Sequence, residues 1–123
     1  MKPSFFILLF FPILVLAQKT YVPDDNFEQA LINLGYDNVL DDSVLTSNIN
    51  IVTYLDVSND SIFDLTGLED FSALDSLYCH GNHLTTIDVS NNTALTTLSC
   101  SVNPLTSLDV SQNIALTNLG VAF

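Results

Sequence analysis

The chain has 123 residues, enough for one domain, and carries two Lys/Arg residues against fourteen Asp and Glu, a net charge of −12. So few cations exclude nucleic-acid binding through phosphate contacts and adsorption to anionic lipid surfaces. A charged fraction of only 13% beside 48% apolar residues also excludes an intrinsically disordered chain.

Residues 1–17 have the organisation of a secretory signal peptide. Lys2 supplies a positive start, an apolar run extends from Phe5 to Leu16, and the small residue Ala17 ends it. A bilayer span needs roughly 20 apolar residues, more than this run provides. We therefore predict cleavage after Ala17, a secreted, extracellular or cell-surface location, and no stable membrane span.

Residues 23–35 predict an amphipathic helix. Asp25 and Glu28 have the spacing of a capping box, and Gly35 is the expected stop. One apolar stripe recurs at helical spacing: Phe27, Ala30, Leu31 and Leu34. We assign residues 18–51 to an N-terminal helical cap, and we expect it to cover the exposed end of the repeats that follow in the sequence.

A repeat of 21 residues occupies the rest of the chain. Residues 74–94 (LDSLYCHGNHLTTIDVSNNTA) align with residues 95–115 (LTTLSCSVNPLTSLDVSQNIA), and residues 116–123 begin a further, partial copy. A looser copy of 22 residues spans 52–73. We expect no C-terminal cap, and we expect the sequence to be a fragment of a longer protein.

The spacing within each copy predicts a stacked coil. Leu77 and Cys79, two residues apart, point to one face of a short strand, and copies side by side pair these strands in parallel. Asn82 follows at the turn, where its amide can serve backbone groups that the bend leaves unpaired. Each copy also contains two similar halves that end in asparagine-led turns. The prediction is a solenoid with a short parallel β-sheet and a convex side that is mostly extended or irregular.

The order L-x-x-L-x-[CV]-x-x-N-x-L resembles the signature of leucine-rich repeats. It is most similar to the internalin-type repeats of secreted bacterial surface proteins, including the 21-residue variety with Cys in the strand. The resemblance covers about residues 20–123. It implies a leucine-rich-repeat solenoid with a helical N-terminal cap, and it is specific to fold and not to ligand.

Cysteines and histidines have structural explanations. Cys79 and Cys100 occupy one inward column in which Val121 takes the next place, as expected of a small apolar core position. We expect packed thiols, although a disulfide stays open. His80 and His83 provide two metal ligands without a third or fourth, so we predict a surface role and no metal site.

The aspartates raise the question of calcium. Asp88 and Asp109 share an outward column, and Asp56 lies in a similar segment of the first copy. Like charges that face one another destabilise a sheet, and calcium would relieve them. Acidic residues near position 40 form a second possible locus: Asp37, Asp41 and Asp42. The alternative is a solvated acidic surface with no cofactor, to which we commit, with calcium kept as a hypothesis.

The outward strand positions are the predicted binding face, since stacked repeats offer such a surface to partners. Its residues are Tyr54, Asp56, Ser58, Ser76, Tyr78, His80, Thr97, Ser99 and Ser101. Tyr54 and Tyr78 are the natural anchors, because aromatic side chains dominate interface energetics. The alternative is that these residues only solvate the sheet.

Catalytic fingerprints for serine hydrolases, P-loop enzymes, dinucleotide enzymes and zinc peptidases are missing from the sequence. We predict a non-enzymatic module that binds a protein or glycan, for instance in adhesion. The alternatives are a structural spacer and an accessory region of a secreted hydrolase.

Overall fold

A computed structural model describes residues 2–5, 12 and 16–122. The elements follow in the order β1 (Lys19–Tyr21), α1 (Asp25–Asn33), β2 (Ser43–Leu45), α2 (Thr46–Ile49), β3 (Tyr54–Asp56), the 3-10 helix η1 (Leu68–Asp70), β4 (Ser76–Tyr78), β5 (Thr97–Ser99) and β6 (Asn118–Gly120). Most of the apolar run of the predicted signal peptide lies outside the described residues. Within the described part of the chain, no helix has the length and apolar character to cross a membrane.

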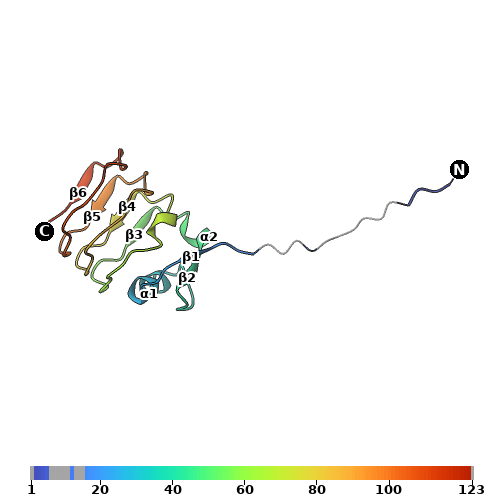
Figure 1. Cartoon of the computed structure of the whole chain (residues 1–123), viewed down its shortest axis with the longest axis horizontal. Coiled ribbons are helices and arrows are strands. Elements are labelled where there is room, and N and C mark those ends of the chain that lie inside the picture. The colour runs from blue at the N-terminus through green and yellow to red at the C-terminus, as the bar shows by residue number, and fades with distance from the viewer. Residues whose placement is uncertain (1, 6–11, 13–15, 123) are drawn as a thin grey trace.

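Strands β3, β4, β5 and β6 form one parallel sheet in sequence order, and Figure 1 shows them side by side along the coil. Leu77 is in register with Leu98, as the 21-residue period predicts, and Leu98 with Leu119. Leu55 occupies the same column one coil earlier. The leucine-rich-repeat solenoid with a short parallel sheet is confirmed.

Asparagines hold neighbouring coils together at the turns after β4 and β5. The Oδ1 atom of Asn82 accepts hydrogen bonds from the backbone of Asp60 and Ile62, both at 3.0 Å. Its Nδ2 atom donates to the carbonyls of Val57 and Cys79, both at 2.9 Å. Asn103 repeats the pattern one coil later, and both side chains are buried. The predicted role of the turn asparagines is confirmed.

The convex half of the coils is extended or irregular, with the 3-10 helix η1 in the first repeat, and in the described residues it contains no regular strand. A second column of buried asparagines supports it. Asn92 donates from Nδ2 to the carbonyls of Leu68 and Phe71 in the preceding coil, and Asn113 donates to those of Val89 and Asn92. The side-chain amide therefore replaces the backbone pairing that a sheet would provide. The expected irregular convex side is confirmed.

The capping-box prediction for α1 was wrong by one residue. Asp24 is the N-cap, and its Oδ1 accepts from the backbone N–H groups of Asn26 and Phe27 at 2.9 and 3.0 Å. Asp25 lies inside the first turn and is exposed. At the other end Gly35 has φ of 85°, the left-handed conformation in which glycine ends a helix, as predicted.

Glu28 makes tertiary contacts in place of the capping role expected of it. The side chain is fully buried, and its carboxylate accepts from the backbone N–H groups of Asp41, Asp42 and Ser43 at 2.9–3.2 Å. These three bonds compensate the burial of the charge and fix α1 to the chain segment that enters β2. Leu34, expected in the apolar stripe, is 46% exposed because it is the C-cap residue and lies beyond the packed face.

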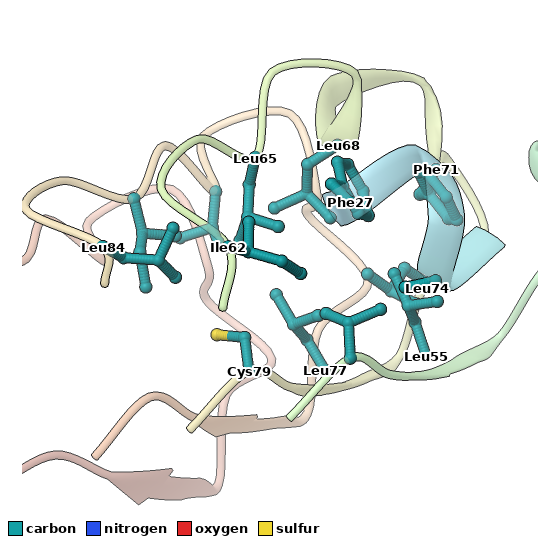
Figure 2. Packing of buried hydrophobic residues seen from close by; sticks show 14 of the residues in the cluster. Phe27, Leu55, Ile62, Leu65, Leu68, Phe71, Leu74, Leu77, Cys79 and Leu84 are labelled. Carbon is teal, nitrogen blue, oxygen red and sulfur yellow. The ribbon is translucent and has the colours of Figure 1, made fainter. Parts of the chain in front are cut away.

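The cap also contains an antiparallel pair of strands, β1 and β2, on either side of α1 in the sequence, which the sequence patterns did not predict. Phe27 of α1 packs on Phe71 of the first repeat with ring centroids 6.4 Å apart, and Figure 2 shows Phe27 beside Leu68. Thr20, which is buried, donates from its hydroxyl to Asp70 at 2.7 Å. Cap and repeats therefore share one continuous hydrophobic core.

Burial decreases toward β6. Leu98 is 1% exposed, whereas Leu119 in the same column is 48% exposed. Leu116 and Val121 are partly buried against the core. The sheet therefore presents the edge of β6 with its apolar column partly open to solvent.

Candidate binding face

We use the term strand face for the outward surface of β3, β4 and β5 and of the residues that follow each strand. It contains every residue expected there: Tyr54, Asp56, Ser58, Ser76, Tyr78, His80, Thr97, Ser99 and Ser101. None of them is buried, because the intervening residues of each strand carry the inward column. The parallel register arranges these side chains in rows across the sheet.

Two tyrosines contact each other at the β3 side of the strand face. The ring centroids of Tyr54 and Tyr78 are 5.3 Å apart, and their planes are inclined by 42°. Tyr54 is in register with Ser76, so the two rings meet diagonally across neighbouring strands. Tyr54 is 56% exposed. The pair is a preassembled aromatic surface, and the contact was not predicted from the sequence.

Asp56 lies beside this pair. It is two residues after Tyr54 on the same strand and in register with Tyr78, so its carboxylate shares the outward surface with both rings. Its Oδ1 accepts from the backbone N–H of Ser58 at 3.0 Å. Burial, and to a smaller extent the charge of Asp56, raise the pKa of Asp60.

The next row contains Ser58 and His80, which lie on neighbouring coils. The Ser58 Oγ and His80 Nδ1 atoms are 2.9 Å apart and form a hydrogen bond. From β5 onward the strand face changes character, because the residues there are small and polar: Thr97, Ser99 and Ser101. The chemistry of the face is therefore concentrated on β3 and β4.

The histidines do not share a metal site. His80 bonds Ser58, whereas His83 stacks on Phe63 with ring centroids 4.7 Å apart. Among the described residues, the groups with three potential metal ligands lie in the cap, and neither contains a histidine.

Cys79 and Cys100 are both free thiols in adjacent coils, and both are buried. Burial raises the pKa of Cys100 to about 11 and that of Cys79 still further. A thiol that stays protonated is a poor nucleophile. The expected column of packed thiols is present, and these residues lie inside the coil, away from the strand face.

Carboxylates gather in the cap near the second calcium locus considered above. Ligand oxygens of Glu28, Asp37 and Asp41 lie within 4.8 Å of one another, and a second such group joins Asp25, Glu28 and Asp42. Both groups depend on Glu28, whose two oxygens already accept three backbone hydrogen bonds. These bonds occupy three of the roughly four lone-pair sites of the carboxylate, so Glu28 has little capacity left to bind a cation.

An open pocket of about 470 Å³ adjoins this loop and is lined in part by Tyr36, Asp37 and Asn48. Lys19 also lines it, with Nζ 4.0 Å from an Asp41 carboxylate oxygen. The cation of the pocket is thus already paired with a carboxylate of the same pocket.

The outward aspartates of the convex side accept hydrogen bonds from serines two residues later in the same turn. Asp88 accepts from the backbone N–H and the hydroxyl of Ser90 at 3.0 and 2.6 Å, and Asp109 accepts from the backbone N–H of Ser111 at 2.8 Å. Hydrogen bonds from these serines lower the pKa of both aspartates. A local structural role therefore accounts for them without calcium.

The parallel strand column, the buried asparagines and the helical cap together define a leucine-rich-repeat domain. No family model matches the chain.

Comparison with known proteins shows which leucine-rich-repeat proteins this domain is similar to. Internalin J of Listeria monocytogenes serotype 4b (strain F2365) is 39% identical over 73 residues, which are 59% of this chain and 8% of that protein. The solved functional domain of InlJ from Listeria monocytogenes, which includes a cysteine ladder, superposes with a TM-score of 0.73 at 34% identity over 89% of this chain and 26% of that chain. An internalin (InlF) of Listeria monocytogenes str. 4b F2365 gives a TM-score of 0.68 at 25% identity over 80% of this chain and 30% of that one.

The chain is an internalin-like leucine-rich-repeat protein. It spans 8% of the length of internalin J and 26% of the solved InlJ chain.

Proposed function

We propose that this chain is a secreted or cell-surface, non-enzymatic module that binds a protein or glycan ligand through its strand face. The observation that carries the proposal is the preassembled tyrosine pair on an otherwise polar sheet surface. An exposed pair of aromatic rings offers a large contact area with little side-chain freedom left to lose on binding. The solenoid supplies a rigid, extended surface around it.

Export is a separate part of the same proposal. The apolar run of residues 5–16 has the composition of a signal peptide. The folded domain begins directly after the expected cleavage point, because the Gln18 carbonyl already accepts from the backbone of Thr46 at 3.1 Å. Cleavage after Ala17 would therefore release the whole domain without removing any part of the β1–β2 strand pair.

Binding can be tested with the purified chain on arrays of glycans and of extracellular proteins. The test variant is Tyr54→Ser combined with Tyr78→Ser. The matched control is Ile114→Ser, because Ile114 is 92% exposed and lies at a turn of the convex side. We expect the tyrosine variant to lose the ligands that the native chain and the control retain. A ligand set that survives in all three proteins would refute the role of the tyrosine pair, and the absence of any ligand for the native chain would instead support the spacer function.

A further inference from the structure

The β3 and β4 end of the strand face combines aromatic rings with uncompensated negative charge. Asp56 lies beside the Tyr54–Tyr78 pair, in register with Tyr78, and Asp60 is exposed at the turn that follows β3. Asp75, the residue before β4, accepts from the Ser76 hydroxyl at 2.7 Å.

Positive charge is missing from this surface. The sequence contains no Lys or Arg after Lys19, and Lys19 lies in the cap, 4.0 Å from Asp41. The acidic groups of the strand face are thus without an internal counter-ion, and the whole chain carries a net charge of −12. A partner with positive charge would be attracted at long range and would relieve the repulsion between Asp56 and Asp60.

We propose that the Tyr54–Tyr78 pair and Asp56 bind a cationic side chain, foremost an arginine, of a basic segment in a protein partner. This inference rests on the proposed function and names the ligand chemistry of the same face. A guanidinium is flat, stacks on aromatic rings and pairs with a carboxylate through two N–H groups. Those two partners lie next to each other here, across one pair of strands.

A neutral glycan fits the same site less well. Sugars stack on a broad, open ring face, whereas these two rings lean on each other at 42° with centroids 5.3 Å apart. A sugar would also leave the charge of Asp56 uncompensated. A guanidinium uses both the rings and the carboxylate.

The test uses the ¹⁵N-labelled chain and three probes. These are the peptide acetyl-Gly-Arg-Gly-Arg-Gly-amide, its counterpart with neutral citrulline in place of arginine, and the glycan chitohexaose. Backbone amide shifts locate each probe and give its Kd at low salt and at about 150 mM salt, where exposed charges are screened beyond roughly 8 Å. We expect the arginine peptide to shift amides in residues 54–58 and 76–80, and the citrulline peptide to bind at least about tenfold more weakly because it lacks the charge.

Variants separate a local site from diffuse attraction. Asp56→Asn retains the oxygen that accepts from Ser58 and removes one charge, and Tyr54→Leu with Tyr78→Leu retains apolar volume and removes the aromatic rings. The control is Asp109→Asn, which removes the same charge from an equivalent Asp-Val-Ser turn on the convex side. We expect the first two to raise the Kd of the arginine peptide about five- to tenfold, and the control to change it less than twofold.

Equal weakening by Asp56→Asn and Asp109→Asn, or equal affinity for arginine and citrulline, would overturn the inference. So would shifts spread over both faces of the coil. If chitohexaose shifts the strand-face amides and the arginine peptide does not, the proposed function survives while the cationic ligand is refuted. If neither probe moves these amides and the arrays find no ligand sensitive to the tyrosines, both fail together.

Discussion

Replacing Asn82 by aspartate tests whether the turn asparagine holds two coils together. The substitution Asn82→Asp preserves the shape of the side chain and the oxygen that accepts from Asp60 and Ile62. It replaces the Nδ2 donor by an oxygen, which then faces the carbonyls of Val57 and Cys79 at 2.9 Å. The Cys79 carbonyl keeps a second donor from Asn103 at 3.0 Å, so the Val57 carbonyl bears the larger loss.

The expected loss follows from these contacts. A buried carbonyl without a donor costs about 1–3 kcal/mol, and the weakened second bond adds about 1 kcal/mol. We therefore expect Asn82→Asp to lower the free energy of unfolding by about 2–4 kcal/mol at neutral pH. With a urea m-value of about 1–2 kcal/mol/M for a small domain, the unfolding midpoint should fall by about 2 M.

The loss should also depend on pH. Two facing carbonyls disfavour the charged carboxylate, so the pKa of the introduced group should be higher in the folded chain than its unfolded value of about 3.9. The folded state then binds the proton more tightly, and stability falls as pH rises from about 4 through the folded pKa. Below about pH 4 the protonated carboxyl can donate one hydrogen bond, and part of the loss should be recovered relative to the native chain at the same pH.

Urea unfolding followed by circular dichroism at pH 4 and pH 7 measures both effects. The control is Asn91→Asp, which adds the same charge at an exposed neighbour of the second asparagine column. If Asn82→Asp loses no more stability than this control, or the same amount at both pH values, the hydrogen bonds do not hold the coils as argued.

Three further outcomes follow from the structure. Asp24→Ala removes the N-cap of α1 and two bonds to the first repeat, and should cost about 2–3 kcal/mol in urea unfolding; a loss below about 0.5 kcal/mol would exclude the docking role. Val102 has a φ of 57°, which is strained for a β-branched residue, and its side chain is 72% exposed. The equivalent residue one coil earlier is Gly81, with a φ of 68°. Val102→Gly should therefore raise stability by about 0.5–1 kcal/mol, and a lower melting temperature would contradict this. Because their pKa is raised, Cys79 and Cys100 should react with Ellman's reagent at pH 8 about a hundredfold more slowly than in urea, whereas equal rates would show that they are accessible.

The repeat could be predicted from the sequence because its period is a direct consequence of the stacked geometry. Residues 21 apart, such as Leu77 and Leu98, alternate with polar residues at strand spacing, and this pattern is compatible with one register only. The turn asparagines were predictable for the same reason, since they recur at a fixed distance from the strand. Outward positions follow from the same alternation.

The cap was predicted less well because its contacts are not periodic. Strands β1 and β2 have three residues each, too few for an alternating pattern to be recognised. Asp24 and Asp25 are chemically identical candidates for the N-cap, and the choice depends on which of them also reaches the first repeat. Glu28 bonds a loop thirteen to fifteen residues away, which no local spacing reveals.

Different side chains of each coil stabilise the fold and form the proposed binding face. Inward side chains and turn asparagines supply the core and most of the side-chain bonds between coils, and the outward positions add the Ser58–His80 hydrogen bond and the Tyr54–Tyr78 contact. At β5 those outward positions are small and polar, as expected of residues that only solvate a sheet. At β3 and β4 the same positions contain two contacting tyrosines and a carboxylate that interacts unfavourably with Asp60. The contrast between neighbouring coils is the pattern expected if the β3 and β4 end of the strand face binds a ligand, as proposed.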